Sequence, residues 1–369
     1  MARHDHAAEA LEEVNCPIAP ERLVGYARHH PVHPPTETDR RPNDSAGSDG
    51  APASSPRGLG AERPLLADIR AALGRVIRGK PEVIDLLLVA VLGAGHVLIE
   101  DVPGVGKTTL AKALARVLDV EFARVQFTPD LLPADILGSV VLNPREGSFS
   151  FQRGPIFTNV VLADEINRAS PRTQSALLEA MNEGQVTVEA KTYPLAQPFF
   201  VIATQNPVDF QGTYPLPEAQ LDRFLLRLTV GYPVEEAELE MLRDRRASDP
   251  LDDLRPLLDA TRIVALQRAV RQIEVRPPVA RYLLRLVRAT REHGDLSLGI
   301  SPRGALGLYR AAQARAALDG RDFVSPDDVQ ALAVPTLAHR VLPTERARYG
   351  GTTSSTVIEQ IVRSLRVPT

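Results

Sequence analysis

Residues 101–109 combine glycines, a lysine and two threonines at a spacing that can bind phosphate. A short apolar segment precedes them and a helical pattern follows, which is the strand–loop–helix context of a phosphate loop. Gly104 and Gly106 let backbone N–H groups turn inward without a Cβ clash, and Lys107 is placed to reach β- and γ-phosphates. The loop departs from the usual pattern at its first position, where Asp101 replaces glycine. The predicted nucleotide-binding residues are Asp101, Val102, Pro103, Gly104, Val105, Gly106, Lys107, Thr108 and Thr109.

A pair of carboxylates follows a second apolar segment, residues 160–163. Asp164 and the hydroxyl of Thr108 are predicted to hold Mg²⁺, and Glu165 is predicted to orient and deprotonate the attacking water. An apolar segment ending in two acidic residues is a weak signal by itself. Together with the phosphate loop, it predicts hydrolysis at the γ-phosphate of a nucleotide.

Apolar segments that alternate with helical patterns must position these residues. The five predicted strands are residues 96–99, 122–127, 160–163, 199–204 and 225–230. Strands separated by helices predict an α/β fold, a parallel sheet with helices on both faces. Ligands of such sheets bind at the carboxyl ends of the strands, where each motif lies. Alternating polar and apolar residues near 138–152 and 185–198 predict two inserted β-hairpins.

The strand signal stops near residue 233, and helical patterns continue. They cover residues 235–246, 260–270, 278–293, 302–318 and 327–338. We therefore expect an α/β core at residues 61–233, a small all-helical domain at 234–342 and a tail at 343–369. Residues 1–60 are rich in Pro, Ser and His and are predicted to form a disordered arm.

Composition narrows the class of protein. Hydrophobic residues make up 44% of the 369 residues, enough for a core, and the formal net charge of −3 does not call for a nucleic-acid partner. Cys16 is the only cysteine, which excludes a disulfide within one chain. The first ten residues or so lack an apolar signal core, and the most apolar run, 86–95, is too short to span a membrane. We expect a soluble, cytoplasmic protein.

Several motifs resemble the AAA+ superfamily and, within it, the MoxR family. The most specific are LIEDVPGVGKT (98–108), GPIF (154–157), ADEINRA (163–169), ATQNP (203–207), EAQLDRF (218–224) and SPR (301–303). The resemblance covers roughly residues 65–342. It implies a phosphate-loop AAA+ core with a five-stranded parallel sheet, a helical lid domain, and hydrolysis of ATP with Mg²⁺.

The resemblance also implies roles for three further residues. Asn206 resembles the sensor that hydrogen-bonds the γ-phosphate or the lytic water, and a side-chain amide can do both. Arg223 resembles the arginine finger, which acts on the site of a neighbouring subunit, and Arg168 is an alternative for that role. Arg303, in the first turn of a predicted helix, resembles the second sensor that reaches the nucleotide from the lid.

Relatives of this kind act like chaperones on other proteins. The resemblance implies a ring, expected to be a hexamer, and a protein client or a partner with a von Willebrand A domain. Because the two hairpins also mark the chelatases, a magnesium-chelatase-like motor subunit is the first alternative. A nucleic-acid motor is the second, disfavoured by the slightly acidic charge and the lack of a helix-turn-helix or zinc module.

Overall fold

The computed structural model describes residues 62–145, 147–206, 213–244 and 249–368, with only the backbone of Asp244. The arm predicted at residues 1–60 lies outside the described residues. No helix in the described ranges is both long and apolar enough to cross a membrane.

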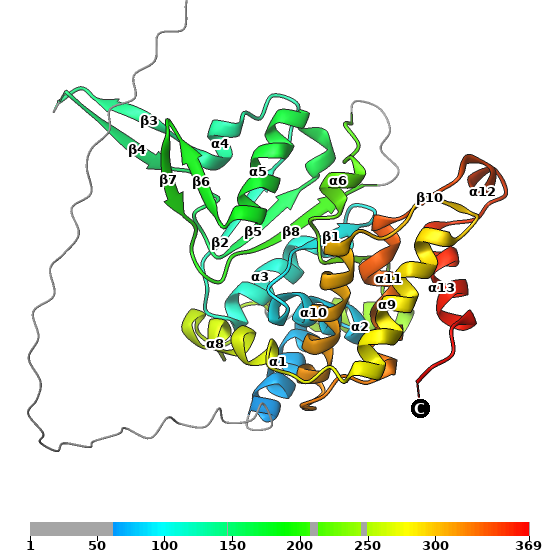
Figure 1. The fold of residues 1–369 in the computed structure, drawn as a ribbon. Coiled ribbons are helices and arrows are strands. Elements are labelled where there is room, and N and C mark those ends of the chain that lie inside the picture. The colour runs from blue at the N-terminus through cyan, green and yellow to red at the C-terminus, as the bar shows by residue number, and fades with distance from the viewer. Residues whose placement is uncertain (1–61, 146, 207–212, 245–248, 369) are drawn as a thin grey trace, which may run out of the picture. The chain divides into compact units, whose positions relative to one another are not determined.

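Five parallel strands form one sheet, as the sequence predicts (Figure 1). They are β1 (Val97–Glu100), β2 (Phe122–Gln126), β5 (Val160–Asp164), β8 (Phe200–Gln205) and β9 (Leu226–Leu228). Their order across the sheet is β2-β5-β8-β1-β9, and every neighbouring pair is parallel. All five predicted strands are confirmed, with small differences at their ends.

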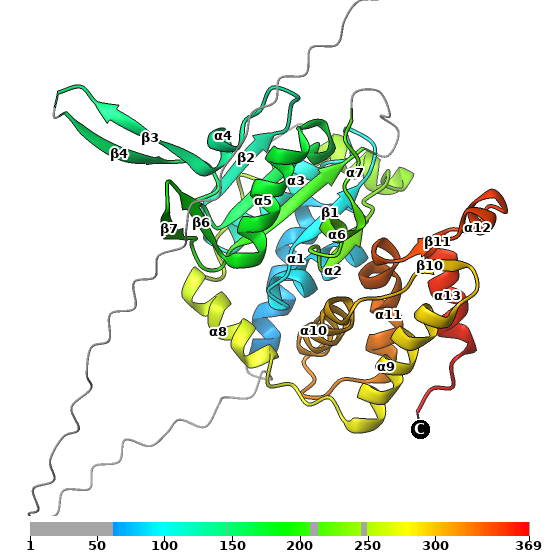
Figure 2. The same ribbon diagram turned by 45° about the horizontal axis from the view of Figure 1, so that its top comes forward.

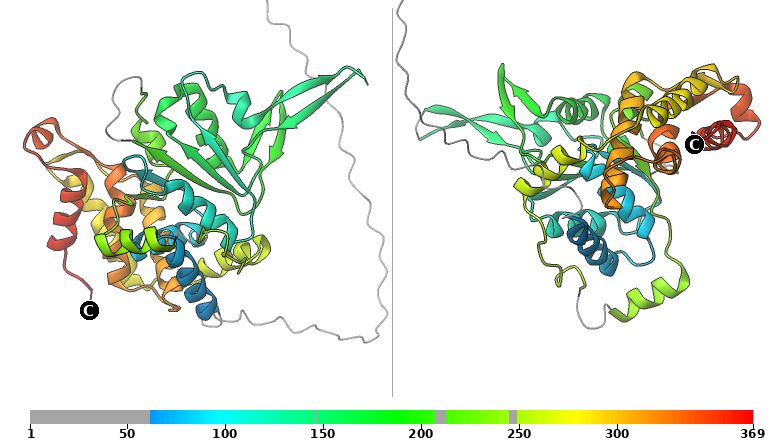
Figure 3. Two further views of the ribbon diagram at one scale, coloured as in Figure 1. Left: turned by 180° about the vertical axis from the view of Figure 1, so that it is seen from behind. Right: turned by 60° about the horizontal axis from the view of Figure 1, so that its bottom comes forward.

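Helices cover both faces of this sheet, which confirms the α/β fold (Figures 1 and 3). The helices of this part of the chain are α1 (Arg63–Val76), α2 (Pro81–Leu92), α3 (Lys107–Val117), α4 (Pro133–Leu137), α5 (Pro171–Glu183) and α6 (Glu218–Leu221). Successive strand residues point to opposite faces. On β5, Val160 and Leu162 therefore join the apolar core with α1, α2 and α3, whereas Val161 and Ala163 join a second core with α5.

Helices dominate the chain after the sheet. They are α7 (Glu235–Asp244), α8 (Ala260–Val270), α9 (Pro277–Glu292), α10 (Pro302–Leu318), α11 (Pro326–Leu337), the 3₁₀ turn η3 (Ala338–Arg340), α12 (Glu345–Tyr349) and α13 (Ser354–Ser364). The prediction of purely helical structure is wrong in one detail, because β10 (Leu296–Leu298) and β11 (Leu342–Pro343) pair antiparallel. Strands this short are too brief to show a two-residue alternation in sequence.

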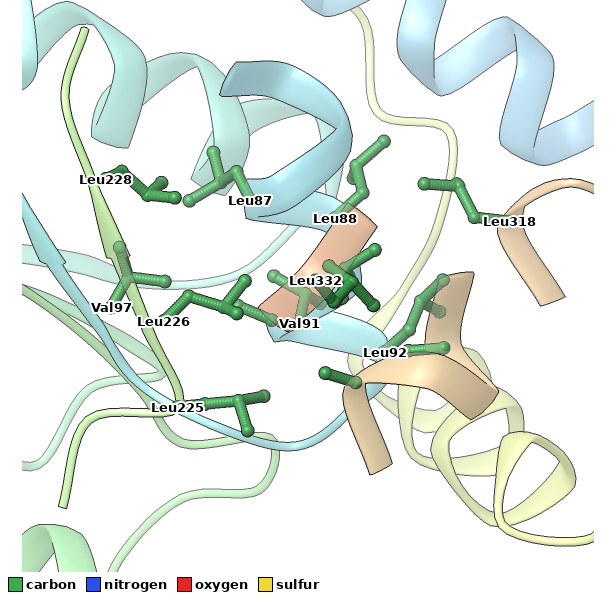
Figure 4. Packing of buried hydrophobic residues seen from close by; sticks show 14 of the residues in the cluster. Leu87, Leu88, Val91, Leu92, Val97, Leu225, Leu226, Leu228, Leu318 and Leu332 are labelled. Carbon is green, nitrogen blue, oxygen red and sulfur yellow. The ribbon is translucent and has the colours of Figure 1, made fainter. Parts of the chain in front are cut away.

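Helix α2 joins the sheet to the helical part of the chain. Figure 4 shows Leu87 facing Leu228 of β9, and Leu88 facing Leu318 of α10. Eight of its residues are buried, and such a helix, apolar on most sides, must be covered on most sides. The sheet, α10 and α11 consequently share one apolar core.

Two hairpins extend from the core, as predicted. They are β3 (Gly138–Asn143) with β4 (Ser148–Arg153), and β6 (Gln185–Val188) with β7 (Lys191–Pro194). Phe151 of β4 stacks on Tyr193 of β7 with ring centroids 4.3 Å apart, which fastens the hairpins together. The β3–β4 hairpin projects well beyond the sheet (Figure 2), and near its tip Phe149 is 74% exposed.

Candidate functional site

A cavity of about 630 Å³ lies at the carboxyl ends of the strands. The phosphate loop contributes Pro103, Gly104, Val105, Gly106, Lys107, Thr108 and Thr109, and the strand ends contribute Arg124, Gln126, Asp164 and Glu165. Residues 75–78 and 230–233, together with Lys80, two residues of the helix at 235–244 and residues 249–250, line its remaining sides. The loop and the carboxylate pair predicted from sequence therefore open onto the same cavity.

The phosphate loop has the backbone that its glycines allow. Gly104 and Gly106 have φ angles of 88° and 90°, a left-handed region that favours glycine. Helix α3 begins directly after them at Lys107, so its free N–H groups and positive dipole end lie beside the cavity. Burial lowers the pKa of Lys107, and the nearby Asp164 carboxylate is the largest opposing influence. A cation and free N–H donors thus lie together, as phosphate binding requires.

Asp101, the departure from the usual loop, does not line the cavity. Its buried carboxylate accepts hydrogen bonds from the backbone N–H groups of Val230, at 2.7 Å, and Gly231, at 2.6 Å. It also accepts one from the next residue, Val102, which is likewise outside the lining. The carbonyl of Asp101 accepts a hydrogen bond from Lys107 Nζ at 2.9 Å. Asp101 therefore ties the phosphate loop to the segment that follows β9.

Thr204 of β8 connects the two acidic residues. Its hydroxyl donates to Asp164 Oδ1 at 2.6 Å and accepts from the backbone N–H of Glu165 at 2.8 Å. Glu165 itself has φ 58° and ψ 50°, a left-handed conformation that costs energy for a residue with a side chain. The backbone at the end of β5 is therefore held in a fixed, strained orientation toward the cavity.

Both carboxylates also have basic or amide partners. Arg124 Nη2 donates to Asp164 Oδ2 at 2.7 Å. Gln126 Nε2 donates to Glu165 Oε2 at 3.1 Å, and Arg168 Nε lies 3.2 Å from the same oxygen. These contacts orient the candidate base within the cavity.

Three residues that contact the acidic pair, Arg124, Gln126 and Thr204, were not predicted from the sequence. Arg124 and Gln126 alternate along β2, so they lie on one face, and Gln126 is in register with Asp164. The alternation is visible in the sequence, but the pairing of β2 with β5 is not. Thr204 reads as an ordinary strand residue until β5 and β8 are placed side by side.

The remaining candidates lie elsewhere in the described structure. Asn206 directly follows β8, at the same edge of the sheet as the acidic pair. Arg223 and Arg303 do not line the cavity of their own chain. Both contact α5 instead: Arg223 donates to the Leu178 carbonyl and Arg303 to Asn182 Oδ1. Both arginines therefore lie beside α5 and not beside the phosphate loop.

The chain is similar to known proteins over most of its length. Two protein families match parts of the chain. The family described as "ATPase family associated with various cellular activities (AAA)" matches residues 96–226, and the family described as "AAA lid domain" matches residues 288–361. Bacillus subtilis YeaC is 48% identical over 83% of this chain and 95% of that protein. The Mycobacterium tuberculosis chaperone MoxR1 is 38% identical, covering 86% of each chain. A crystal structure of a Cytophaga hutchinsonii protein superposes with a TM-score of 0.79, at 36% identity, covering 84% of this chain and 97% of that one.

The matched families agree with the order of elements in the structure. Most of the α/β core that forms the cavity lies in the AAA match, and helices α10, α11 and α12, which follow it, lie in the AAA lid match. The chain belongs to the MoxR family of AAA+ ATPases.

Proposed function

We propose that this protein hydrolyses ATP to ADP and phosphate and uses the reaction to remodel, mature or activate a protein partner in the cytoplasm. The observation that carries the proposal is the cavity in which Lys107, Asp164 and Glu165 meet. Relatives named MoxR, and the chaperone MoxR1, support the choice of a protein client over a chelatase partner or nucleic acid.

The predicted site residues have distinct parts in this reaction. Lys107 and the N–H groups of the phosphate loop bind the phosphates. Thr108 and Asp164 supply the hard oxygen ligands that suit Mg²⁺, which would neutralise phosphate charge when bound. Glu165, oriented by Gln126 and Arg168, takes a proton from the attacking water. Asn206 orients that water or the γ-phosphate.

Arg223 completes the site of a neighbouring subunit in a ring, for which we propose a hexamer. The resemblance implies that Arg303 reaches the nucleotide from the lid, and we extend the same action on the neighbouring site to Arg303. Their position outside the cavity of their own chain supports this assignment, because a guanidinium must contact the transferring phosphoryl group to stabilise its charge. In this scheme residues 61–233 form the nucleotide-binding core and 234–342 the lid. Hydrolysis moves the lid relative to the core, and the hairpins transmit that motion to the client.

Specific ATPase activity measured against protein concentration tests the proposal. Activity should rise with concentration as rings form, and Arg223→Ala should abolish the rise and lower kcat by about 10³-fold. Arg268→Ala removes an exposed arginine on α8 and serves as the matched control. Glu165→Gln should remove turnover and retain ATP binding. Activity that is independent of concentration and unchanged by Arg223→Ala would rule out the shared site.

A further inference from the structure

Arg340, at the end of η3, is a buried arginine whose hydrogen-bonding capacity is completely used. Its side chain is only 3% exposed. Nε donates to the carboxylate of Asp222, Nη1 to the carbonyls of Leu225 and Thr336, and Nη2 to the carbonyls of Asp222 and Phe224. A guanidinium has five N–H groups, and each has a partner here. An arginine held in this way fixes the position of whatever it contacts.

Most of those contacts fall on the residues that flank Arg223. Asp222 and Phe224 are its immediate neighbours, and their carbonyls both accept from Arg340 Nη2. The Phe224 carbonyl also lies 3.0 Å from His339 Nε2, which must carry the hydrogen because a carbonyl only accepts. Burial lowers the pKa of His339 well below its usual value, so this histidine is neutral. His339 and Arg340 of the lid thus hydrogen-bond to the backbone on both sides of Arg223.

The same network reaches Arg303. While Asp222 Oδ1 pairs with Arg340 at 2.8 Å, Asp222 Oδ2 accepts from the hydroxyl of Ser301 at 3.0 Å. Ser301 is the N-cap of α10, and Arg303 lies in the first turn of that helix. Gly304 leaves room for the arginine, because a Cβ there would lie 3.0 Å from Arg340 Cδ. One carboxylate therefore joins the segments that carry both arginines.

Desolvation offsets much of the attraction in a buried ion pair, so we assign this pair a role in geometry rather than in stability. Burial lowers the pKa of Arg340 to about 10, against the opposing influence of Asp222, so the side chain stays charged at neutral pH. Lysine would keep the charge but could not make the planar, forked set of contacts.

We propose that Arg340 is a positioning residue: by clamping the backbone around Arg223 and sharing Asp222 with Ser301, it makes Arg223 and Arg303 one rigid unit presented to the neighbouring subunit. This inference rests on the proposed action of Arg223 on a neighbouring site. It makes the lid, through η3, responsible for the geometry of a site that belongs to the next subunit.

Kinetics of Arg340→Lys provide the first test. The variant keeps its own cavity, so KM for ATP should stay within about twofold of the wild-type value, whereas kcat should fall by about tenfold or more. Asp222→Asn, which weakens the same clamp from the other side, should show the same split. A variant that loses ATP affinity and kcat together, or neither, would contradict the proposal.

Mixed rings separate positioning from general damage. Arg340→Lys and Lys107→Ala chains, carrying different tags, are co-expressed and purified through both tags. An Arg340→Lys subunit has an intact cavity, and a Lys107→Ala neighbour supplies an intact Arg223, so the mixture should exceed the activity of either variant alone. Arg340→Lys mixed with Arg223→Ala should not recover, because neither chain presents a working arginine. Asp222→Asn should behave as Arg340→Lys does in both mixtures.

Mixed rings of Arg223→Ala and Lys107→Ala chains distinguish the trans action of Arg223 from the positioning role of Arg340. Recovery in that pair, without recovery for Arg340→Lys or Asp222→Asn with Lys107→Ala, would overturn the role of Arg340 and leave the shared site intact. Failure of all these pairs to recover would overturn the shared site itself.

Discussion

Single residues at the cavity have environments that ordinary surface residues lack. Glu165 holds a left-handed backbone conformation and accepts from Gln126, and Lys107 lies half-buried among carboxylates. Strain of this kind persists only where surrounding contacts over-determine it. Thr204 provides two of those contacts, so a residue with no predicted role fixes the geometry of both predicted acidic residues.

Asp101 stabilises the phosphate loop through contacts of both its side chain and its backbone carbonyl. Asp101→Ala would leave the N–H groups of Val230 and Gly231 without their acceptor, and the free energy of unfolding should fall by about 2–4 kcal/mol. Because Lys107 also bonds to the Asp101 carbonyl, ATP affinity should weaken as the loop loosens. Urea denaturation and nucleotide titration measure the two effects. Asp101→Asn keeps one acceptor oxygen, so its free energy of unfolding should lie between those of the wild type and Asp101→Ala. Equal stability of all three proteins would contradict this assignment.

Individual elements were predicted well where local pattern determines them. The strands, both hairpins and helices α8 and α10 follow from apolar periodicity and from capping residues such as Ser301. The contacts that complete the site were not predictable, because they join distant parts of the chain. Arg124 meets Asp164 across 40 residues, and Arg340 meets Asp222 across 118. Their partners depend on strand order and lid placement, which a single sequence does not reveal.

His96, just before β1, illustrates how one side chain can join three elements. Its Nε2 lies 3.1 Å from the Met181 carbonyl of α5, and its Nδ1 accepts from the Val201 N–H of β8 at 3.1 Å. Burial lowers its pKa from 6.5 to about 4, so the folded protein keeps this histidine neutral. The unfolded chain therefore binds an additional proton between these two pH values, and the histidine's effect is to reduce stability as pH falls through them.

Replacing His96 should remove that pH dependence. Between about pH 8 and about pH 5, the wild-type free energy of unfolding should fall by about 2 kcal/mol more than that of His96→Gln, whose side chain does not titrate. Urea denaturation at the two pH values gives the difference, and other titrating groups cancel because both proteins share them. Parallel changes in the two proteins would mean that His96 is not held neutral.

The whole molecule joins a nucleotide cavity to hairpins that extend away from it (Figure 2). The two hairpins are not independent, because Phe151 stacks on Tyr193 and both rings contact Phe157 edge to face. Near the β3–β4 tip, Val141 and Leu142 are 43% and 48% exposed, and Phe149 is 74% exposed. Large apolar side chains exposed together mark surfaces that bind other proteins. The proposed client therefore has a candidate contact that is separate from the cavity.

Client capture tests this separation of hydrolysis from binding. Glu165→Gln, held in its ATP state, should retain a client from a native cell lysate, and adding Lys107→Ala should release it because ATP no longer binds. Adding Phe149→Ser to Glu165→Gln should lower the captured amount by about tenfold, as expected for loss of an aromatic side chain that becomes buried when the client binds. In the otherwise unchanged protein, Phe149→Ser should leave basal ATP turnover intact, because the side chain is exposed and does not line the cavity. Capture unaffected by Phe149→Ser would move the client contact away from the tip, whereas recovery of chelatase subunits or nucleic acid would change the partner assigned to the same ATPase.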